Sequence, residues 1–207
     1  MKRWVYILTA MLVTGCVKSK GTSPTQADPP RTVLPQHAQT LSGDSWLQPS
    51  LAVDLDPDPN VVHVSLVAER LTFTVGEQTI EGYGYNGQIP GPTIEAKEGD
   101  RVIVDFVNGL ETSTTVHWHG LHVPFAMDGV VWQGAPIAPG EGYRYEFVLN
   151  QHGTYWYHPH FDTERTLDLG LYGALLVRED DEPEVTEDVV LVFDQWSENE
   201  SKETVFD

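Results

Sequence analysis

Two short motifs, in which histidines alternate with another residue, are the feature of this sequence best suited to chemistry. They are His117-Trp118-His119 and His158-Pro159-His160. Residues i and i+2 of a strand point to the same face, about 6.5–7 Å apart, so each motif presents two imidazoles side by side. Imidazole without thiolate suits Cu(II), Zn(II), Ni(II) or Fe(II), whereas Mg²⁺ and Ca²⁺ prefer oxygen ligands. The pattern predicts a metal site supplied by two strands.

A metal needs access to these histidines. Pro159 has no N–H to donate to a sheet ladder, so its strand should lie at an edge or end there, leaving the histidines at an open rim. The alternative is a set of surface or hydrogen-bonded histidines without metal. For a single motif this alternative and a metal site are equally favoured, but the presence of two motifs favours the metal site. His122 is interpreted as a neighbour of the site or a surface residue. The other histidines are interpreted as strand-end, turn or solvated residues: His63, His152 and His37.

Short apolar runs separated by turn residues are expected to position the motifs. In the run 101–107, Val102, Val104 and Phe106 would share one face, with Arg101 and Asp105 on a wet face. No helix of more than a few turns is indicated, and strands of this length and spacing predict an all-β Greek-key β-sandwich or barrel. The predicted strands include residues 61–67, 71–75, 101–107, 143–149, 154–157 and 189–193.

Composition excludes several classes of function. The 207 residues are enough for one domain with tails. With 12 Lys+Arg against 31 Asp+Glu, the formal net charge is -19 at pH 7, which opposes binding to nucleic acid. The one cysteine, Cys16, excludes a disulfide framework, a cysteine-based zinc site and an iron–sulfur cluster within this chain.

The N-terminus resembles a bacterial lipoprotein signal. Two basic residues precede an apolar run, 4–13, which is about half as long as a membrane span. The run leads into Leu12-Val13-Thr14-Gly15-Cys16, which resembles a lipobox, so residues 1–15 would be cleaved and Cys16 lipidated. The alternative is an ordinary signal peptide with an incidental cysteine. Residues 16–59 are predicted to be a flexible, disordered linker because they lack apolar periodicity. The protein is expected to be exported and lipid-anchored to a bacterial membrane; Val17 after the cysteine favours the outer membrane.

The folded part, residues 60–195, resembles the N-terminal cupredoxin domain of multicopper oxidases of the laccase and cuprous oxidase type. The likeness runs from about residue 62 to residue 195 and rests on several motifs in order. Residues 196–207 are expected to be a polar tail or the start of a second domain. The matching motifs are Gly84-Tyr85-Asn86-Gly87, Pro90-Gly91-Pro92-Thr93-Ile94, Thr115-Val116-His117-Trp118-His119-Gly120, Met127-Asp128-Gly129 and Gly153-Thr154-Tyr155-Trp156-Tyr157-His158-Pro159-His160.

The resemblance implies a plastocyanin-like β-sandwich that supplies half the ligands of a trinuclear copper cluster. His117 would bind the type 2 copper, and the paired type 3 coppers would be bound by His119, His158 and His160. Asp128 would lie near the cluster and assist proton delivery to reduced oxygen, since a carboxylate can orient a water and relay its proton. The alternative is an ordinary turn aspartate before Gly129.

The sequence also departs from the family. It has two such histidine motifs where a complete multicopper oxidase has four, and Cys16 is too far from them to build a type 1 copper site. The chain is therefore not expected to be active alone, and whether it is an enzyme stays open. It could be the N-terminal part of an oxidase, completed by cupredoxin domains in trans or by a homo-oligomer. It could instead be a non-catalytic copper-binding lipoprotein for sequestration or copper tolerance, or a sandwich with vestigial histidines.

Overall fold

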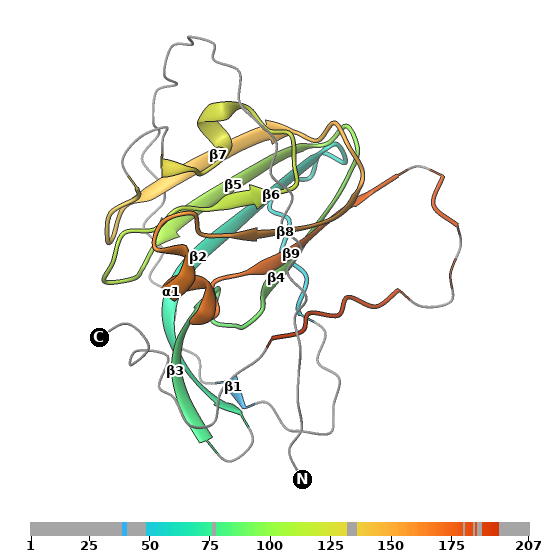
Figure 1. Ribbon diagram of the computed structural model, residues 1–207. Coiled ribbons are helices and arrows are strands. Elements are labelled where there is room, and N and C mark those ends of the chain that lie inside the picture. Colours follow the sequence, from blue (N-terminus) through green and yellow to red (C-terminus); the bar gives the residue numbers. More distant parts are fainter. Residues whose placement is uncertain are drawn as a thin grey trace.

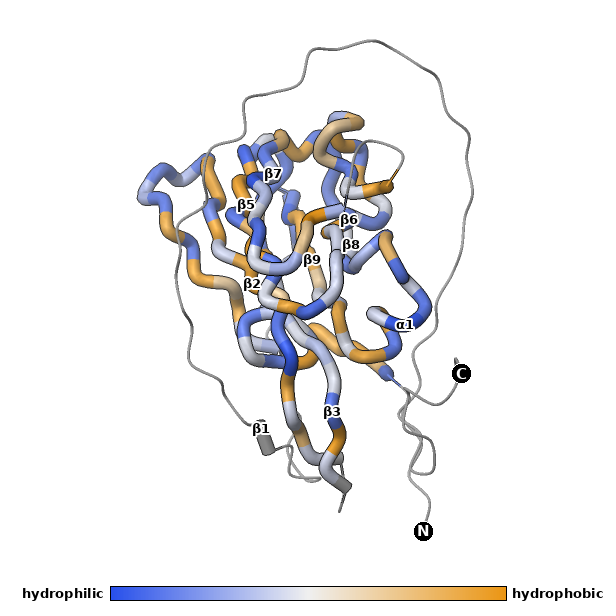
Figure 2. Tube along the Cα trace, turned by 90° about the vertical axis from the view of Figure 1, so that its left-hand side faces the viewer, coloured by the Kyte–Doolittle hydropathy of each residue, from blue (hydrophilic) through white to orange (hydrophobic). Residues whose placement is uncertain are grey.

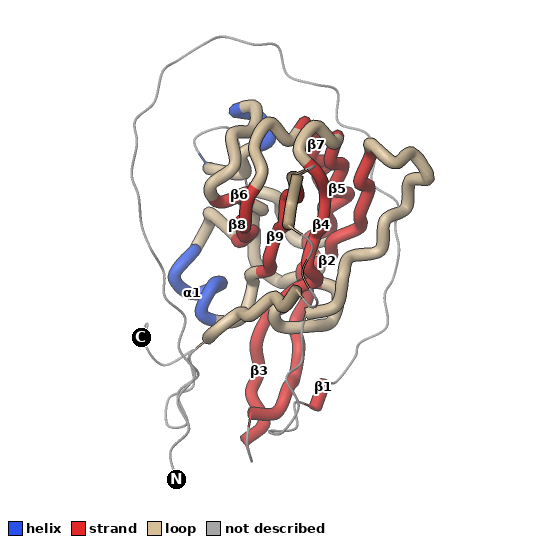
Figure 3. The backbone as a smooth tube through the Cα atoms, turned by 90° about the vertical axis from the view of Figure 1, so that its right-hand side faces the viewer, coloured by secondary structure: helices blue, strands red, loops and turns tan. Residues whose placement is uncertain are grey.

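The computed structural model describes residues 39–40, 49–75, 78–131, 136–179, 181–183, 185 and 188–194. Within these residues the chain is strand and loop apart from two short helical segments (Figure 3). The elements are β1 (Gln39–Thr40), β2 (Val61–Val75), β3 (Gln78–Tyr85), β4 (Gly91–Lys97), β5 (Arg101–Asn108), β6 (His117–His119), η1 (Phe125–Met127), β7 (Gly142–Val148), β8 (Gly153–His158), α1 (Thr163–Asp168) and β9 (Gly173–Arg178).

The strands form two sheets packed face to face (Figure 1). One sheet has the order β1-β2-β5-β7, with β3 also paired to β2, and the other has the order β4-β9-β8-β6. The chain passes back and forth between the sheets, and the β2–β3 hairpin extends beyond the sandwich (Figure 1). The predicted all-β sandwich is confirmed.

Alternating apolar residues build the core between the sheets. On β5, Val102, Val104 and Phe106 are fully buried, as predicted, and they meet Trp118 and Tyr157 from the opposite sheet in one apolar cluster. Apolar and polar residues intermingle along the chain in the hydropathy view (Figure 2), as expected for strands that have one face toward a core.

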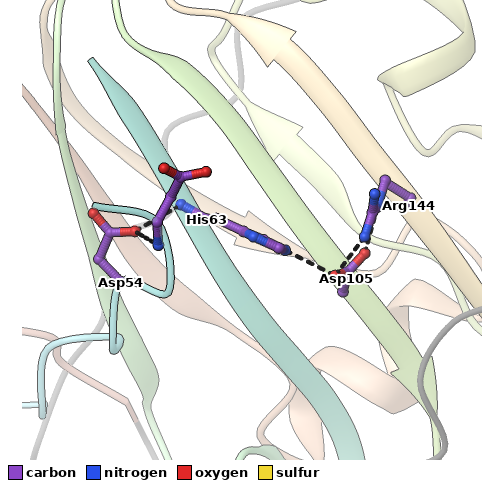
Figure 4. Close-up of polar contacts among 5 residues, drawn as sticks. Asp54, His63, Asp105 and Arg144 are labelled. Atoms are coloured by element: carbon purple, nitrogen blue, oxygen red, sulfur yellow. Dashed lines mark hydrogen bonds and ion pairs between the residues drawn. The ribbon is translucent and has the colours of Figure 1, made fainter. Parts of the chain in front are cut away.

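The predicted wet face of β5 is wrong in one respect, because Asp105 is buried. Its carboxylate accepts hydrogen bonds from Arg144 Nε at 2.6 Å and from Arg144 Nη2 at 2.8 Å. His63 Nε2 lies 2.8 Å from the same carboxylate (Figure 4). His63 is held in turn inside β2, opposite Ile103 of β5, and is not a strand-end or turn residue. Neighbouring side chains on adjacent strands therefore cover a charge that would otherwise face water.

Two local predictions differ from the structure. The runs 61–67 and 71–75 join into the single strand β2, because the intervening residues pair with β3. Residues 189–193 form no strand. Within the predicted linker, Ala52 donates a backbone hydrogen bond to Thr93, and Thr93 donates one to Ser50, both at 2.8 Å. Residues 50–52 therefore lie along the edge strand β4, and Leu55 donates a backbone hydrogen bond to His63 of β2 at 2.7 Å.

Other predictions fall outside the described residues. These are the signal segment 1–15, Cys16, His37 and the tail 196–207. Among the residues that the structure describes, no helix is long and apolar enough to span a membrane.

Candidate metal centre

Pairing of β6 with β8 brings the two histidine motifs together. The strands are antiparallel, and His117 lies opposite His158 while His119 lies opposite Trp156. Between these rungs, Trp118 and Tyr157 point into the core, where both are fully buried. Because side chains alternate along each strand, the histidines lie on the outer face of the sheet. β6 is the last strand of its sheet, and β8 ends at His158, just before Pro159.

The imidazoles are close enough to share metal ions. One ring nitrogen from each of His117, His119 and His158 lies within 4.8 Å of the others. His160 adjoins this group, with its ring centroid 4.9 Å from that of His117 and 6.1 Å from that of His158. The structure thus gathers all four histidines singled out in the sequence, from positions about 40 residues apart.

Backbone carbonyls fix which ring nitrogen carries the proton and which the lone pair in two of these rings. His117 Nδ1 donates to the carbonyl oxygen of Asp128 at 2.8 Å, and His158 Nδ1 donates to that of Pro159 at 2.8 Å. A ring whose Nδ1–H is held in this way keeps the lone pair of Nε2 for a metal. The Nε2 of His158 lies 3.1 Å from Nδ1 of His119. In this contact one of the two nitrogens carries a proton, and a metal ion could take the place of that proton.

The cluster favours neutral imidazole. Burial, together with the neighbouring histidines, lowers the pKa of His158 to about 3. Burial also lowers the pKa values of His119 and His160, helped by the charge that His117 would carry. Since a metal binds unprotonated imidazole, these three rings are in the binding form at neutral pH. An all-imidazole set of neutral donors fits copper.

Asp128 lies beside this cluster, directly after η1. Its carboxylate Oδ1 is 3.2 Å from His117 Nδ1. The next residue, Gly129, has φ +67°, and a Cβ there would lie 1.8 Å from the carbonyl oxygen of Val116. The loop can therefore press against the backbone that enters β6 only with glycine at this position.

Trp156 is a contact that the sequence analysis did not identify. Its ring stacks on His158, with centroids 4.0 Å apart and planes at 25°, and lies 4.9 Å from the ring of His119. Since Trp156 precedes His158 by two residues in a strand, the period-2 pattern would have placed it on the same face.

The remaining histidines with described surroundings have other partners. His122 donates its backbone N–H to Gln151, and His63 belongs to the Asp105 cluster. His152 lies 2.7 Å from Glu98 and 3.3 Å from Glu179. Its pKa is raised because both carboxylates stabilise the imidazolium.

Comparison with known proteins gives consistent results. Residues 68–182 match the family model described as multicopper oxidase. Copper resistance protein A of Pseudomonas syringae pv. tomato is 36% identical over 167 residues, which are 75% of this chain and 26% of that protein. Multicopper oxidase MCE of Talaromyces pinophilus is 39% identical over 132 residues, 58% of this chain and 21% of that one.

Solved structures agree with these sequence matches. A multicopper oxidase from Campylobacter jejuni, described as a metallo-oxidase, is 32% identical with a TM-score of 0.61, and the match covers 71% of this chain and 31% of that one. A multicopper oxidase from Pseudomonas thermotolerans is 36% identical with a TM-score of 0.57, covering 59% and 30%. The cupredoxin type of the predicted sandwich is thereby confirmed. The chain spans about a quarter of the length of the curated relatives it matches.

Proposed function

The chain belongs to the multicopper oxidase family, whose cofactor is copper, and we propose that its sandwich supplies half of the ligands of a trinuclear copper site. The observation that carries the proposal is the convergence of imidazoles from β6 and β8. By resemblance, His117 would hold the type 2 copper. The paired type 3 coppers would be held by His119, His158 and His160.

In this proposal, bound copper supplies one-electron redox chemistry for the reduction of dioxygen coupled to substrate oxidation. The residues of this chain orient the ligands. Asp128 and Pro159 hold the Nδ1–H groups of His117 and His158 through their carbonyl oxygens, so that Nε2 of each ring carries the lone pair that can bind copper. Trp156 shields one face of His158 from water.

We assign Asp128 a second task at the same place. Its carboxylate lies 3.2 Å from His117 Nδ1, on the side of the ring away from the Nε2 that would bind copper, so it would exchange protons with water at the edge of the cluster. A carboxylate there can accept and return a proton. Asp128 would thus relay protons and also end the helical turn η1.

The site needs ligands from outside residues 60–195, the proposed cupredoxin domain. Four imidazoles cannot satisfy three copper ions, and the one cysteine, Cys16, is distant in sequence from every histidine motif. We propose that other cupredoxin domains complete the cluster and provide the type 1 copper, on a longer polypeptide, in trans or in an oligomer. Residues 1–15 would direct export, and lipidation of Cys16 would anchor the protein to the membrane.

Copper loading of the full chain tests this proposal. We expect Cu(II) bound by imidazole nitrogen, a type 2-like electron paramagnetic resonance signal and no intense blue thiolate-to-copper band. His117→Ala with His119→Ala should abolish binding, whereas His122→Ala, which removes a histidine outside the cluster, should not. Copper binding that survives the double substitution would contradict the assignment.

A non-catalytic role in copper binding is the second candidate, and the name of the copper resistance protein relatives favours keeping it. The two candidates separate when the copper-loaded chain is mixed with the other cupredoxin domains of an oxidase and a cuprous or phenolic donor. Oxygen uptake that depends on His158 supports the oxidase. Copper binding without oxygen uptake in that mixture supports sequestration.

A further inference from the structure

We propose that Thr115 is a positioning residue for the copper site, because its hydroxyl fixes the second histidine motif against the first. The inference rests on the proposed copper site. It concerns a side chain that lies two residues before His117 and is not itself a proposed ligand.

The hydroxyl replaces a missing part of the sheet. Pairing of β6 with β8 stops at the His117–His158 rung, and the next residue, Pro159, has no N–H to extend the ladder. Beyond it, the backbone N–H of His160 donates to Thr115 Oγ1 at 2.8 Å. A side-chain acceptor just before β6 thus holds the backbone just after β8, where regular pairing has ended.

The residues before and after Thr115 are themselves fixed by backbone hydrogen bonds. Thr114 exchanges two backbone hydrogen bonds with Ile137, at 3.0 and 2.9 Å. The N–H of Val116 donates to the hydroxyl of Tyr145 at 3.0 Å. Thr115 is buried, so water competes little for its hydroxyl.

The consequence is a defined position for His160. This residue lies outside β8, so the ladder does not hold it, yet its ring is 4.9 Å from that of His117. If Thr115 loses its acceptor, the His160 N–H is left unsatisfied unless the segment moves. Movement of the backbone would carry the imidazole away from His117.

The chain offers a matched control. Thr114 is the neighbouring residue and is also buried, but its hydroxyl donates to the carbonyl oxygen of Thr115 at 3.4 Å and not to the backbone of the second motif. Thr115→Val and Thr114→Val therefore remove the same atom from adjacent buried positions. Thr115→Ser keeps the acceptor and removes only a methyl group.

Two measurements on the full chain test the proposal. The first needs no metal: amide hydrogen exchange at His160 should be slow in the native chain, Thr115→Ser and Thr114→Val, and at least about tenfold faster in Thr115→Val. The second is Cu(II) titration followed by electron paramagnetic resonance. Thr115→Val should lower copper affinity by about 10-fold to 100-fold, as outer contacts of metal ligands do, and should change the spectrum, while the other two variants keep both.

The proposal is overturned if His160 exchange and the copper spectrum are unchanged in Thr115→Val, or if Thr114→Val changes them equally. If Thr115→Val does not fold, Thr115→Ala is compared with Thr115→Ser, and equal exchange at His160 in this pair also overturns it. A third outcome is that His160 exchange depends on Thr115 but the native chain binds no copper. That result would refute the proposed function, and it would also reject a positioning role in a copper site, because the contact would then be purely structural.

Discussion

Tyr145→Phe should destabilise the sandwich, because it removes one buried hydrogen-bond acceptor and little else. Tyr145 is 2% exposed, and its hydroxyl accepts the N–H of Val116 at 3.0 Å. Its ring packs edge-on against Trp118 with centroids 5.4 Å apart, a contact that phenylalanine keeps. The loss leaves a buried N–H without a partner, which costs about 1–3 kcal/mol of the free energy of unfolding.

Urea unfolding followed by tryptophan fluorescence measures this difference. Tyr143→Phe is the control, because Tyr143 lies on the same strand and its hydroxyl donates to the carbonyl of Ala126 at 2.9 Å. Tyr143 is only half-buried, so loss of this hydrogen bond should lower the free energy of unfolding by only about 0.5–1 kcal/mol. Equal effects of the two substitutions, or a Tyr145→Phe protein as stable as the native one, would refute the reasoning. Either result would show that the Val116 N–H has another acceptor.

Two other predictions concern the loops. His152→Gln should destabilise the fold at acidic pH and have no effect at alkaline pH. Glu98 and Glu179 raise the pKa of His152 above its ordinary value of 6.5. The stability that the imidazolium contributes is therefore fully present below pH 6.5 and is lost as the pH rises through the raised pKa. The difference in melting temperature between the two proteins across that range is the measurement, and a constant difference would contradict it. Gly129→Ala should cost at least about 1–2 kcal/mol, since the residue has φ +67° and the new Cβ would meet the carbonyl of Val116; thermal unfolding would show it, and an unchanged melting temperature would mean that the loop is not pressed against β6.

Contacts between residues far apart in the sequence could not be predicted from the sequence. Burial of Asp105 depends on His63 from β2 and Arg144 from β7, which lie 42 and 39 residues away in sequence. The alternation on β5 identifies the face of Asp105 but not what covers that face. The packing of residues 50–52 along β4 is similar, since a stretch without apolar periodicity can still pair through its backbone.

The sequence by itself determined the local geometry of the site. The two-residue period of a strand places His117 and His119 on one face, and the same period buries Trp118 between them. The order of the motifs was enough to identify the family, and β7 follows its alternation, whereas both faces of β5 are largely buried. The assignment of each histidine to a particular copper ion stays a prediction.

Only the tertiary structure decided how the two motifs meet. The antiparallel pairing of β6 with β8 sets His117 opposite His158 and brings Nδ1 of His119 to 3.1 Å from Nε2 of His158. The same pairing places Trp156 over the cluster, and the Asp128 carbonyl selects the free nitrogen of His117. Side-chain spacing along one strand follows from backbone geometry alone. Contacts between strands depend on which segments pair and in what register, and that depends on the packing of the whole core.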